Sequence, residues 1–482
     1  MMGFPGVGTW IERRAARSPS DVALETEDGS RSYADLAREI GAAAGMLRRH
    51  GIGVGDRVAF HGRNHPTALV SLFATAAIGA AWVPIHPARP EDEVRSVLED
   101  SGARLLIRAS PRTHPDVSIP ELEAAEFVGL AADGRELPAW APASDDVAIL
   151  AYTSGTTGSP KGVILSHGNL LWDVIQMVAE CAMGPADVTL AAAPFTRMGG
   201  LGVTVLPTLF AGGRVVVPPS ADGASVLATI ERARVTVVFA NPDLLQDMVR
   251  APGWDDADLS SVRTGVVGGG LVPELLLRSY LDRGVPLLHG YGLTEAAPIV
   301  SLLGERDAVT RAGSVGRPLP FVEVRSLRSD GSICGPGEVG EWWIRGPNVS
   351  AGYWRRAPVR DADGWFPTGD VGVIDADGYL TFMDRASSVM RAGDHLVYPA
   401  TIERALYGTP GLTDVAAVDV DGRIVVGIVA ETDVAASDLL TGLRSMLAPH
   451  EVPHEVRRVA EIPRNVAGKV RREALRELLM DR

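Results

Sequence analysis

The sequence predicts an α/β protein, in which parallel sheets are covered by helices and are followed by two smaller regions of different character. In the first third of the chain, apolar residues recur at helical spacing through 36–47, Gly51 marks a stop, and the strand-like run 55–60 follows. The run 67–88 repeats the order of helix and strand, and the segment 213–240 gives a strand, a helix and a second strand. This alternation is typical of parallel sheets whose strands are joined by covering helices.

The two smaller regions occupy the last third of the chain. From about residue 313 the predicted strands become short and are separated by Asp-Gly and Gly-Pro-Gly turns, which indicates a β-rich region. After Asp384 the pattern changes again, to a helix near 400–407, strands at 415–420 and 423–430, and a helix near 471–480. We therefore expect a domain boundary at about 383–388, which divides the chain into residues 1–384 and 385–482.

Composition limits the class of protein. The 482 residues carry 46 Lys and Arg against 60 Asp and Glu, a formal net charge of −14, which argues against sequence-independent nucleic-acid binding. The two cysteines, Cys181 and Cys334, are far apart and match no metal or redox spacing. With no targeting signal in view, they favour a reducing, cytoplasmic location. The uncharged run 67–88 contains Pro84 and Pro87 and is rich in Ala and Gly, so we expect a buried helix leading into a strand and no membrane span.

One glycine-rich segment carries most of the chemical information. Three glycines and several hydroxyl residues stand in the string Tyr152-Thr-Ser-Gly-Thr-Thr-Gly-Ser-Pro-Lys-Gly-Val163, after the apolar run 147–151 and before a helix predicted to begin near Ser166. A turn between a strand and a helix can offer successive backbone N–H groups and hydroxyls to phosphate oxygens, and Lys161 adds a cation. The spacing of the nucleotide-triphosphatase loop is not met. The segment therefore predicts a phosphate site of another type.

This string and several later motifs resemble, in order, the signatures of the adenylate-forming superfamily, which includes acyl- and aryl-CoA synthetases, adenylation domains of peptide synthetases, and luciferases. The later motifs are Gly268-Gly-Gly-Leu, His289-Gly-Tyr-Gly-Leu-Thr-Glu295, Gly337-Glu-Val-Gly-Glu-Trp-Trp-Ile-Arg-Gly-Pro347, Gly364-Trp-Phe-Pro-Thr-Gly-Asp370, Arg385, Tyr398-Pro-Ala-Thr-Ile-Glu403 and Pro463-Arg-Asn-Val-Ala-Gly-Lys469. The resemblance covers nearly the whole chain. It implies a large N-terminal AMP-binding domain of stacked αβαβα sheets with a β-rich subdomain, and a small, mobile α+β C-terminal domain.

The resemblance also implies an AMP-forming ligase that uses ATP and Mg²⁺ to activate a carboxylic acid as an acyl-adenylate. A carboxylate is a poor electrophile, so attack on the α-phosphate of ATP and loss of pyrophosphate prepare it for transfer. For the second step we favour thioester formation with CoA. Transfer to an amine or another non-CoA nucleophile is the alternative, and a non-catalytic nucleotide-binding relative is a third reading.

Individual roles follow from the same resemblance. The β- and γ-phosphates would be held by Thr153, Ser154, Gly155, Thr156, Thr157, Gly158 and Lys161. Adenine would lie against Gly268, Gly269, Gly270, Tyr291 and Gly292. Thr294 would bond the α-phosphate, Glu295 would hold Mg²⁺ and Asp370 would accept the ribose hydroxyls. Arg385 would lie at the junction of ribose and phosphate, and Lys469 would bridge the reacting carboxylate and the phosphate.

The sequence departs from the family pattern at positions that concern the acceptor and the acid. Ser387 stands where relatives carry a charged hinge residue, and Asp394 replaces a glycine beside the pantetheine tunnel of CoA-using members, which raises the amine alternative. Thr196 and Arg197 replace an aromatic–His pair, and Arg197 either pairs with a substrate carboxylate or points to solvent. The pocket candidates are Phe195, Arg197, Met198, Phe239 and Asn241, with Gly268 beside them. This mixture favours a small or aromatic acid with a polar substituent over a plain long alkyl chain.

Overall fold

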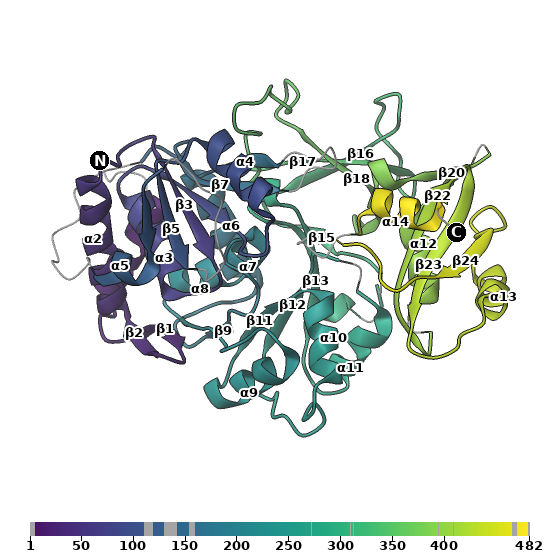
Figure 1. Cartoon of the computed structure of the whole chain (residues 1–482), viewed down its shortest axis with the longest axis horizontal. Helices are drawn as coiled ribbons and strands as arrows, with labels where there is room; N and C mark the ends of the chain where they lie inside the picture. The colour runs from purple at the N-terminus through teal and green to yellow at the C-terminus, as the bar shows by residue number, and fades with distance from the viewer. Residues whose placement is uncertain are drawn as a thin grey trace.

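The computed structural model describes residues 5–109, 119–129, 142–153, 160–270, 272–308, 310–311, 313–393, 395–407, 409–464 and 470–480. Within these ranges the chain forms a large N-terminal portion and a smaller C-terminal portion, which lie next to each other along the long axis of the molecule (Figure 1). The predicted α/β class is confirmed, because helices alternate with largely parallel strands through the N-terminal portion.

The first large sheet has six strands in the order β6-β5-β3-β4-β7-β8, and every neighbouring pair except β7 and β8 is parallel. Its strands are β3 (Arg57–Gly62), β4 (Ala81–Ile85), β5 (Leu105–Ala109), β6 (Glu121–Glu123), β7 (Val147–Thr153) and β8 (Lys161–Ser166). The connecting helices are α2 (Tyr33–Arg49), α3 (Pro66–Ala77), α4 (Glu91–Ser101) and α5 (Ala124–Gly129), with the short α1 (Trp10–Ala15) before them.

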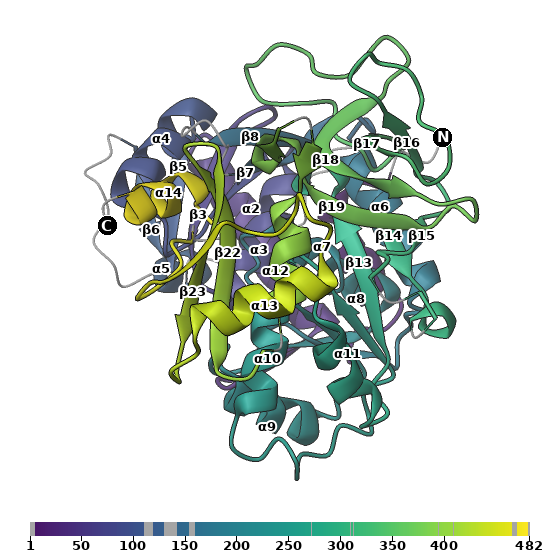
Figure 2. The same cartoon turned by 90° about the vertical axis from the view of Figure 1, so that its right-hand side faces the viewer.

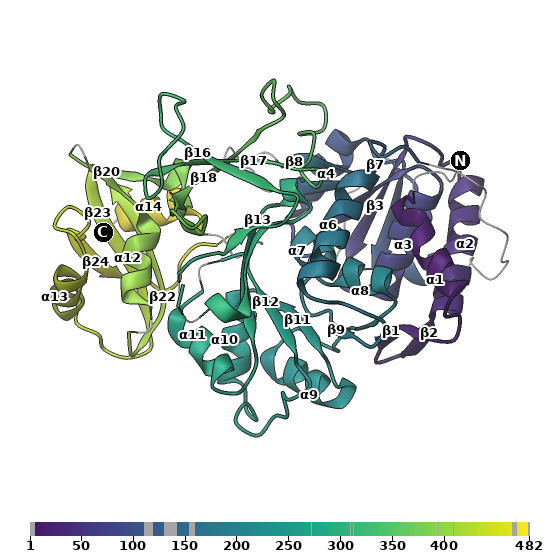
Figure 3. The same cartoon turned by 180° about the vertical axis from the view of Figure 1, so that it is seen from behind.

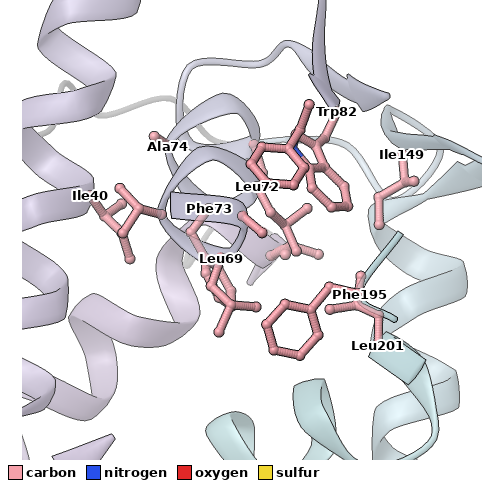
Figure 4. Packing of buried hydrophobic residues seen from close by; sticks show 14 of the residues in the cluster. Ile40, Leu69, Leu72, Phe73, Ala74, Trp82, Ile149, Phe195 and Leu201 are labelled. Atoms are coloured by element: carbon pink, nitrogen blue, oxygen red, sulfur yellow. The ribbon is translucent and has the colours of Figure 1, made fainter. Parts of the chain in front are cut away.

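The uncharged run 67–88 forms the centre of this portion. Every residue of α3 is buried, and Leu69, Leu72 and Phe73 project from it towards Ile40 of α2 and Trp82 of β4 (Figure 4). A helix that is apolar all round has to be covered on all sides. The expectation of a buried helix leading into a strand is confirmed.

The second large sheet has nine strands in the order β15-β14-β13-β12-β11-β9-β10-β1-β2, and the stretch from β13 to β1 is parallel. Its strands are β1 (Val22–Thr26), β2 (Gly29–Ser32), β9 (Val188–Leu190), β10 (Arg214–Val216), β11 (Val237–Ala240), β12 (Thr264–Val267), β13 (Leu287–Gly292), β14 (Ile299–Leu303) and β15 (Arg317–Pro318). From behind, α9 (Gly223–Ala233), α10 (Pro242–Arg250) and α11 (Glu274–Leu281) flank β11 to β13 (Figure 3). Helices α6 (His167–Glu180), α7 (Met198–Gly202) and α8 (Val205–Ala211) complete the portion.

The predicted β-rich region forms a four-stranded antiparallel sheet in chain order. Its strands are β16 (Glu323–Leu327), β17 (Val339–Arg345), β18 (Phe366–Ile374) and β19 (Leu380–Arg385). The last pair places Asp370 of β18 opposite Arg385 of β19. This register decides the geometry of the candidate site described below.

The C-terminal portion begins beyond β19 and faces the viewer in Figure 2. Its buried apolar residues form clusters of their own. Its elements are the hairpin β20 (Met390–Ala392) and β21 (His395–Val397), helices α12 (Pro399–Leu406), α13 (Ala436–Met446) and α14 (Arg472–Met480), and the sheet of β22 (Leu412–Val420), β23 (Arg423–Ala430) and β24 (Glu455–Arg458). The portions touch where the Tyr407 hydroxyl donates to Oε1 of Gln246 at 3.0 Å. The exact division at 383–388 stays a prediction.

Across the residues that the structure describes, no helix combines the length and the apolar character needed to cross a membrane. The uncharged run discussed above is divided between α3 and β4.

Candidate active site

Three residues predicted to contact a nucleotide meet in one polar cluster. The Tyr291 hydroxyl, at the end of β13, donates to Oδ2 of Asp370 at 2.5 Å, and Nε of Arg385 lies 2.9 Å from Oδ1 of Asp370. The register of β18 and β19 explains why the ion pair forms, and Arg385 also donates to the Thr368 carbonyl at 2.8 Å. Asp370 is only 3% exposed, so its charge is compensated within the protein.

Burial and the neighbouring charges fix the protonation states in this cluster. Burial, reinforced by Asp370, holds the pKa of the Tyr291 phenol well above its usual range. Burial is the largest single influence and would lower the pKa of Arg385, but Asp370, with smaller contributions from Tyr291, Glu295 and Tyr353, makes the net shift upward. The cluster therefore combines a neutral phenol donor, a carboxylate and a guanidinium at neutral pH.

Glycines allow two backbone segments to pass each other beside Tyr291. A Cβ at Gly292 would lie 2.0 Å from the Pro298 carbonyl oxygen, and one at Gly268 would lie 2.9 Å from the Gly290 carbonyl oxygen. Gly269 has φ +85°, a conformation that favours glycine. Because β12 and β13 are paired neighbours, the structure brings the Gly268–Gly270 and Tyr291–Gly292 motifs side by side. Their role in lining adenine stays a prediction.

Glu295, the predicted magnesium ligand, lies directly after β13 in the 3₁₀ turn Thr294–Ala296. Its side chain is largely buried, and Oε1 accepts the Tyr353 hydroxyl at 2.8 Å. Carboxylate oxygens are ligands that a hard cation such as Mg²⁺ prefers, and the Tyr353 hydroxyl occupies only one of the two in Glu295. Among the residues that the structure describes, no group of three or more His, Cys, Asp or Glu side chains could hold a metal ion.

The glycine-rich segment differs from the prediction in its surroundings. It links two antiparallel strands and not a strand and a helix, because Lys161 begins β8 and pairs with Thr153 at the end of β7. The apolar residues that follow Lys161 form this extra strand before α6, whose first turn is capped by Ser166 as expected. Ser154, Gly155, Thr156, Thr157 and Gly158 lie outside the described residues, as do Asp394 and Lys469.

An arginine that the motif analysis did not single out fixes the start of this segment. Arg89 is buried, donates to the Tyr152 carbonyl oxygen at 2.6 Å and forms an ion pair with Glu93 at 2.7 Å. It stands 63 residues before Tyr152, so no local spacing could have indicated the contact.

The predicted acid-pocket residues do not all face one space. Phe195 is 1% exposed, and its ring packs in the core towards Leu69 and Leu201 (Figure 4); Met198 belongs to the same core. Asn241 is exposed and caps α10, its side chain accepting the Leu244 N–H at 3.0 Å.

Two of the pocket candidates, Phe239 and Arg197, have surroundings that suit residues lining a binding pocket. Phe239 of β11 lies against Gly199, where a Cβ would be 3.3 Å from the ring. Arg197 is half-buried, so it does not simply point to solvent. Burial and the nearby Arg89 cation lower the pKa of Arg197 to about 10, and it therefore remains charged at neutral pH.

Asp384 has a structural role that sequence reasoning missed. Its Oδ2 accepts the Ala400 N–H at the start of α12 at 2.9 Å and lies 3.8 Å from Arg472 of α14. Arg472 also pairs with Glu403 at 2.7 Å. Only the fold brings these three ionic residues together, since they are spread over more than eighty positions. Ser387 lies exposed in the 3₁₀ turn Ala386–Ser388.

Comparison with known proteins agrees with this arrangement. Residues 11–354 match the family model described as "AMP-binding enzyme". The chain is 38% identical to a feruloyl-CoA synthase of Amycolatopsis sp. over 96% of its length and 97% of the relative's. It is 34% identical to an indoleacetate–CoA ligase of Aromatoleum aromaticum over 98% and 97% of the two chains.

A solved structure extends the agreement to the fold. The o-succinylbenzoate CoA synthetase of Bacillus subtilis, in complex with its acyl-adenylate intermediate, superposes with a TM-score of 0.90 at 28% identity over 97% of each chain. The same enzyme in complex with ATP and a magnesium ion gives 0.87 at 28% identity over 97% and 99%. Fold and site together define an adenylate-forming enzyme. The chain belongs to the AMP-binding enzyme family.

Proposed function

We propose that this protein is an AMP-forming acid–CoA ligase, which activates a carboxylic acid with ATP and transfers the acyl group to CoA. The observation that carries the proposal is the cluster of Tyr291, Asp370 and Arg385 beside the Thr294–Glu295 turn. Two relatives that match over nearly their full length are named as a feruloyl-CoA synthase and an indoleacetate–CoA ligase. Two unpaired cysteines are in keeping with a cytoplasmic site of action.

In the first step a carboxylate oxygen of the acid attacks the α-phosphorus of ATP, and the bond to the bridging oxygen of pyrophosphate breaks. Catalysis of such a step depends on positioning and on stabilisation of negative charge. Asp370 binds the ribose hydroxyls, Tyr291 and the two glycine segments enclose adenine, and Arg385 lies between ribose and phosphate. Lys161 contacts the outer phosphates, and Lys469 bridges the two reacting groups.

The predicted cation fits this site through Glu295, with Thr294 beside it. Bound Mg²⁺ supplies neutralisation of phosphate charge. In the second step the CoA sulfur attacks the acyl carbon, and the bond to the AMP oxygen breaks. This gives a thioester and AMP, and the thiol proton is released.

The favoured substrate is an aromatic or arylalkyl acid with a polar substituent. Phe239 supplies an apolar wall next to Gly199, and the Arg197 cation offers a partner for an anionic or strongly polar group. The named relatives act on feruloyl, indoleacetate and o-succinylbenzoate acids, which all combine an aromatic ring with polar groups.

Pyrophosphate release with a panel of acids tests the proposal. The purified protein is incubated with ATP, Mg²⁺ and ferulate, indoleacetate, 2-succinylbenzoate or palmitate, with and without CoA. We expect release with an aryl acid and a CoA-dependent thioester by mass spectrometry. If pyrophosphate is released but no thioester forms, and a product appears only when an amine is added, the acceptor is an amine and not CoA. Tight ATP binding without release from any acid would support a non-catalytic relative.

A further inference from the structure

Tyr353 contacts two residues that the proposed function assigns to the ATP phosphates and their cation. Its hydroxyl donates to Oε1 of Glu295 at 2.8 Å, while Nζ of Lys161 lies over its ring, 5.7 Å from the centroid. None of the roles assigned from the motifs includes Tyr353. It stands 58 positions from Glu295, so the pairing exists only in the folded chain.

Backbone hydrogen bonds hold Tyr353 in place from both sides. The Trp354 N–H donates to the Gly162 carbonyl at 2.7 Å, and Gly352 accepts from the Ile164 N–H at 3.0 Å. Residues 352–354 thereby run beside β8 directly after Lys161, with an isolated bridge between Val163 and Tyr353.

The turn that carries Glu295 is fixed to the same segment. The Ser350 N–H donates to the Glu295 carbonyl oxygen at 2.7 Å, and the Ser350 hydroxyl donates to the Ile164 carbonyl at 2.6 Å. Strand β8, the segment around Tyr353 and the Glu295 turn thus form one hydrogen-bonded unit. A side chain at the centre of that unit can set the spacing of the groups on either side.

We propose that Tyr353 is a positioning residue, which holds the Glu295 carboxylate and the Lys161 ammonium in a fixed relation for the metal and the phosphates. The proposal rests on the proposed function, which gives Glu295 and Lys161 those ligands. The hydroxyl uses one carboxylate oxygen and selects one orientation of Glu295. The ring face provides a favourable place for the Lys161 ammonium.

The Tyr353 hydroxyl donates its hydrogen bond to Oε1 of Glu295. The ring packs near Phe366 with centroids 6.1 Å apart, a contact that does not depend on the hydroxyl. Tyr353→Phe therefore removes the bond to Glu295 and keeps both the packing and the surface under Lys161.

The test compares Tyr353→Phe with Tyr379→Phe in the full-length protein. Tyr379 is the matched control, because its hydroxyl also donates to a carboxylate, Oδ2 of Asp307 at 2.7 Å, outside the proposed site. Two quantities are measured: the Mg²⁺ concentration for half-maximal pyrophosphate release, and Mn²⁺ affinity in the presence of a non-hydrolysable ATP analogue, from water-proton relaxation. Changes to a group that orients a metal ligand typically weaken metal affinity by 10-fold or more.

We expect Tyr353→Phe to weaken both metal measurements about tenfold, with most of the rate recovered at saturating Mg²⁺, and Tyr379→Phe to leave both unchanged. Unchanged metal dependence in Tyr353→Phe would refute the positioning role. A second variant, Glu295→Gln, shows whether such a result concerns only Tyr353 or also the assignment of Glu295 as the metal ligand. If Glu295→Gln weakens metal binding and Tyr353→Phe does not, only the role of Tyr353 is wrong. If neither does, the metal assignment of Glu295 is wrong as well.

Discussion

Asp370→Asn tests the nucleotide site most directly, because it removes a charge and keeps the shape of the side chain. Asp370 is almost fully buried and accepts from both Tyr291 and Arg385. In the proposed complex it also accepts two ribose hydroxyls. Hydrogen bonds to a charged group contribute about 1.5–3 kcal/mol each, against about 0.5–1.5 kcal/mol between neutral groups. Each bond to position 370 therefore loses about 1 kcal/mol in the variant.

For the nucleotide this gives a loss of about 2 kcal/mol over the two ribose bonds, or about 30-fold in Kd for ATP. For the fold the loss is of similar size, about 2 kcal/mol, since the Arg385 side chain is 36% exposed and water partly compensates its charge. Isothermal titration with ATP and Mg²⁺ measures the first quantity, and urea unfolding without ligand measures the second.

Asp375→Asn is the matched control. Asp375 follows the same strand, β18, and pairs with Arg311 at 3.0 Å, where both side chains are more than a third exposed. We expect little change in ATP affinity from this variant. An Asp370→Asn protein that binds ATP as tightly as the wild type, or a control that binds it equally weakly, would refute the assignment of Asp370 to the ribose.

The remaining predictions concern stability and catalysis. Burial raises the pKa of Asp173 well above its usual range, so the folded chain binds a proton at Asp173 more tightly than the unfolded chain does. The stability linked to this proton is full below about pH 4 and falls as pH rises towards the folded pKa. Asp173→Asn should therefore gain stability relative to the wild type as pH increases in urea titrations, and a difference that does not vary with pH would contradict this. Arg472→Met should cost about 3 kcal/mol in urea unfolding, because it leaves the buried Asp384 and Glu403 carboxylates without their cation; an unchanged midpoint would show that the cluster is not stabilising. Lys469→Ala should abolish adenylation in the pyrophosphate assay while ATP binding is kept, and normal turnover would exclude its catalytic role.

Local motifs singled out the three residues of the Tyr291–Asp370–Arg385 cluster, whereas their role in binding a nucleotide stays a prediction. Tyr291, Asp370 and Arg385 are far apart in sequence, yet each string carried its own signature, and the fold brings them together. The fold class could also be predicted from the sequence, because the spacing of apolar residues reflects which side of each helix or strand is buried.

Contacts without a local pattern could not be predicted. The sequence predicts a helix directly after the glycine-rich segment, whereas strand β8 comes first. The apolar residues of β8 run without a break into those of α6, so the pattern does not separate the two elements. Phe195 was assigned to the pocket from its motif neighbours, whereas packing against α3 decides its place. The contacts of Arg89 and Tyr353 could not be predicted, because their partners Tyr152 and Glu295 lie 63 and 58 positions away in the sequence. Residue spacing does not indicate contacts over such separations.

The contacts around Arg385 bear on the rotation of the C-terminal portion that the family resemblance implies. Arg385 bonds Asp370 in the N-terminal portion, whereas the neighbouring Asp384 side chain reaches α12 and Arg472 in the C-terminal portion. A rotation about 386–388 would keep the first pair and break the second, leaving buried ionic groups that need new partners. Ser387 carries no charge at the predicted hinge position, but Asp384, three residues earlier at the end of β19, makes an ionic contact with Arg472. The strength of the Asp384–Arg472 contact, and not the uncharged residue Ser387, should therefore decide the relative populations of the present arrangement and a rotated one.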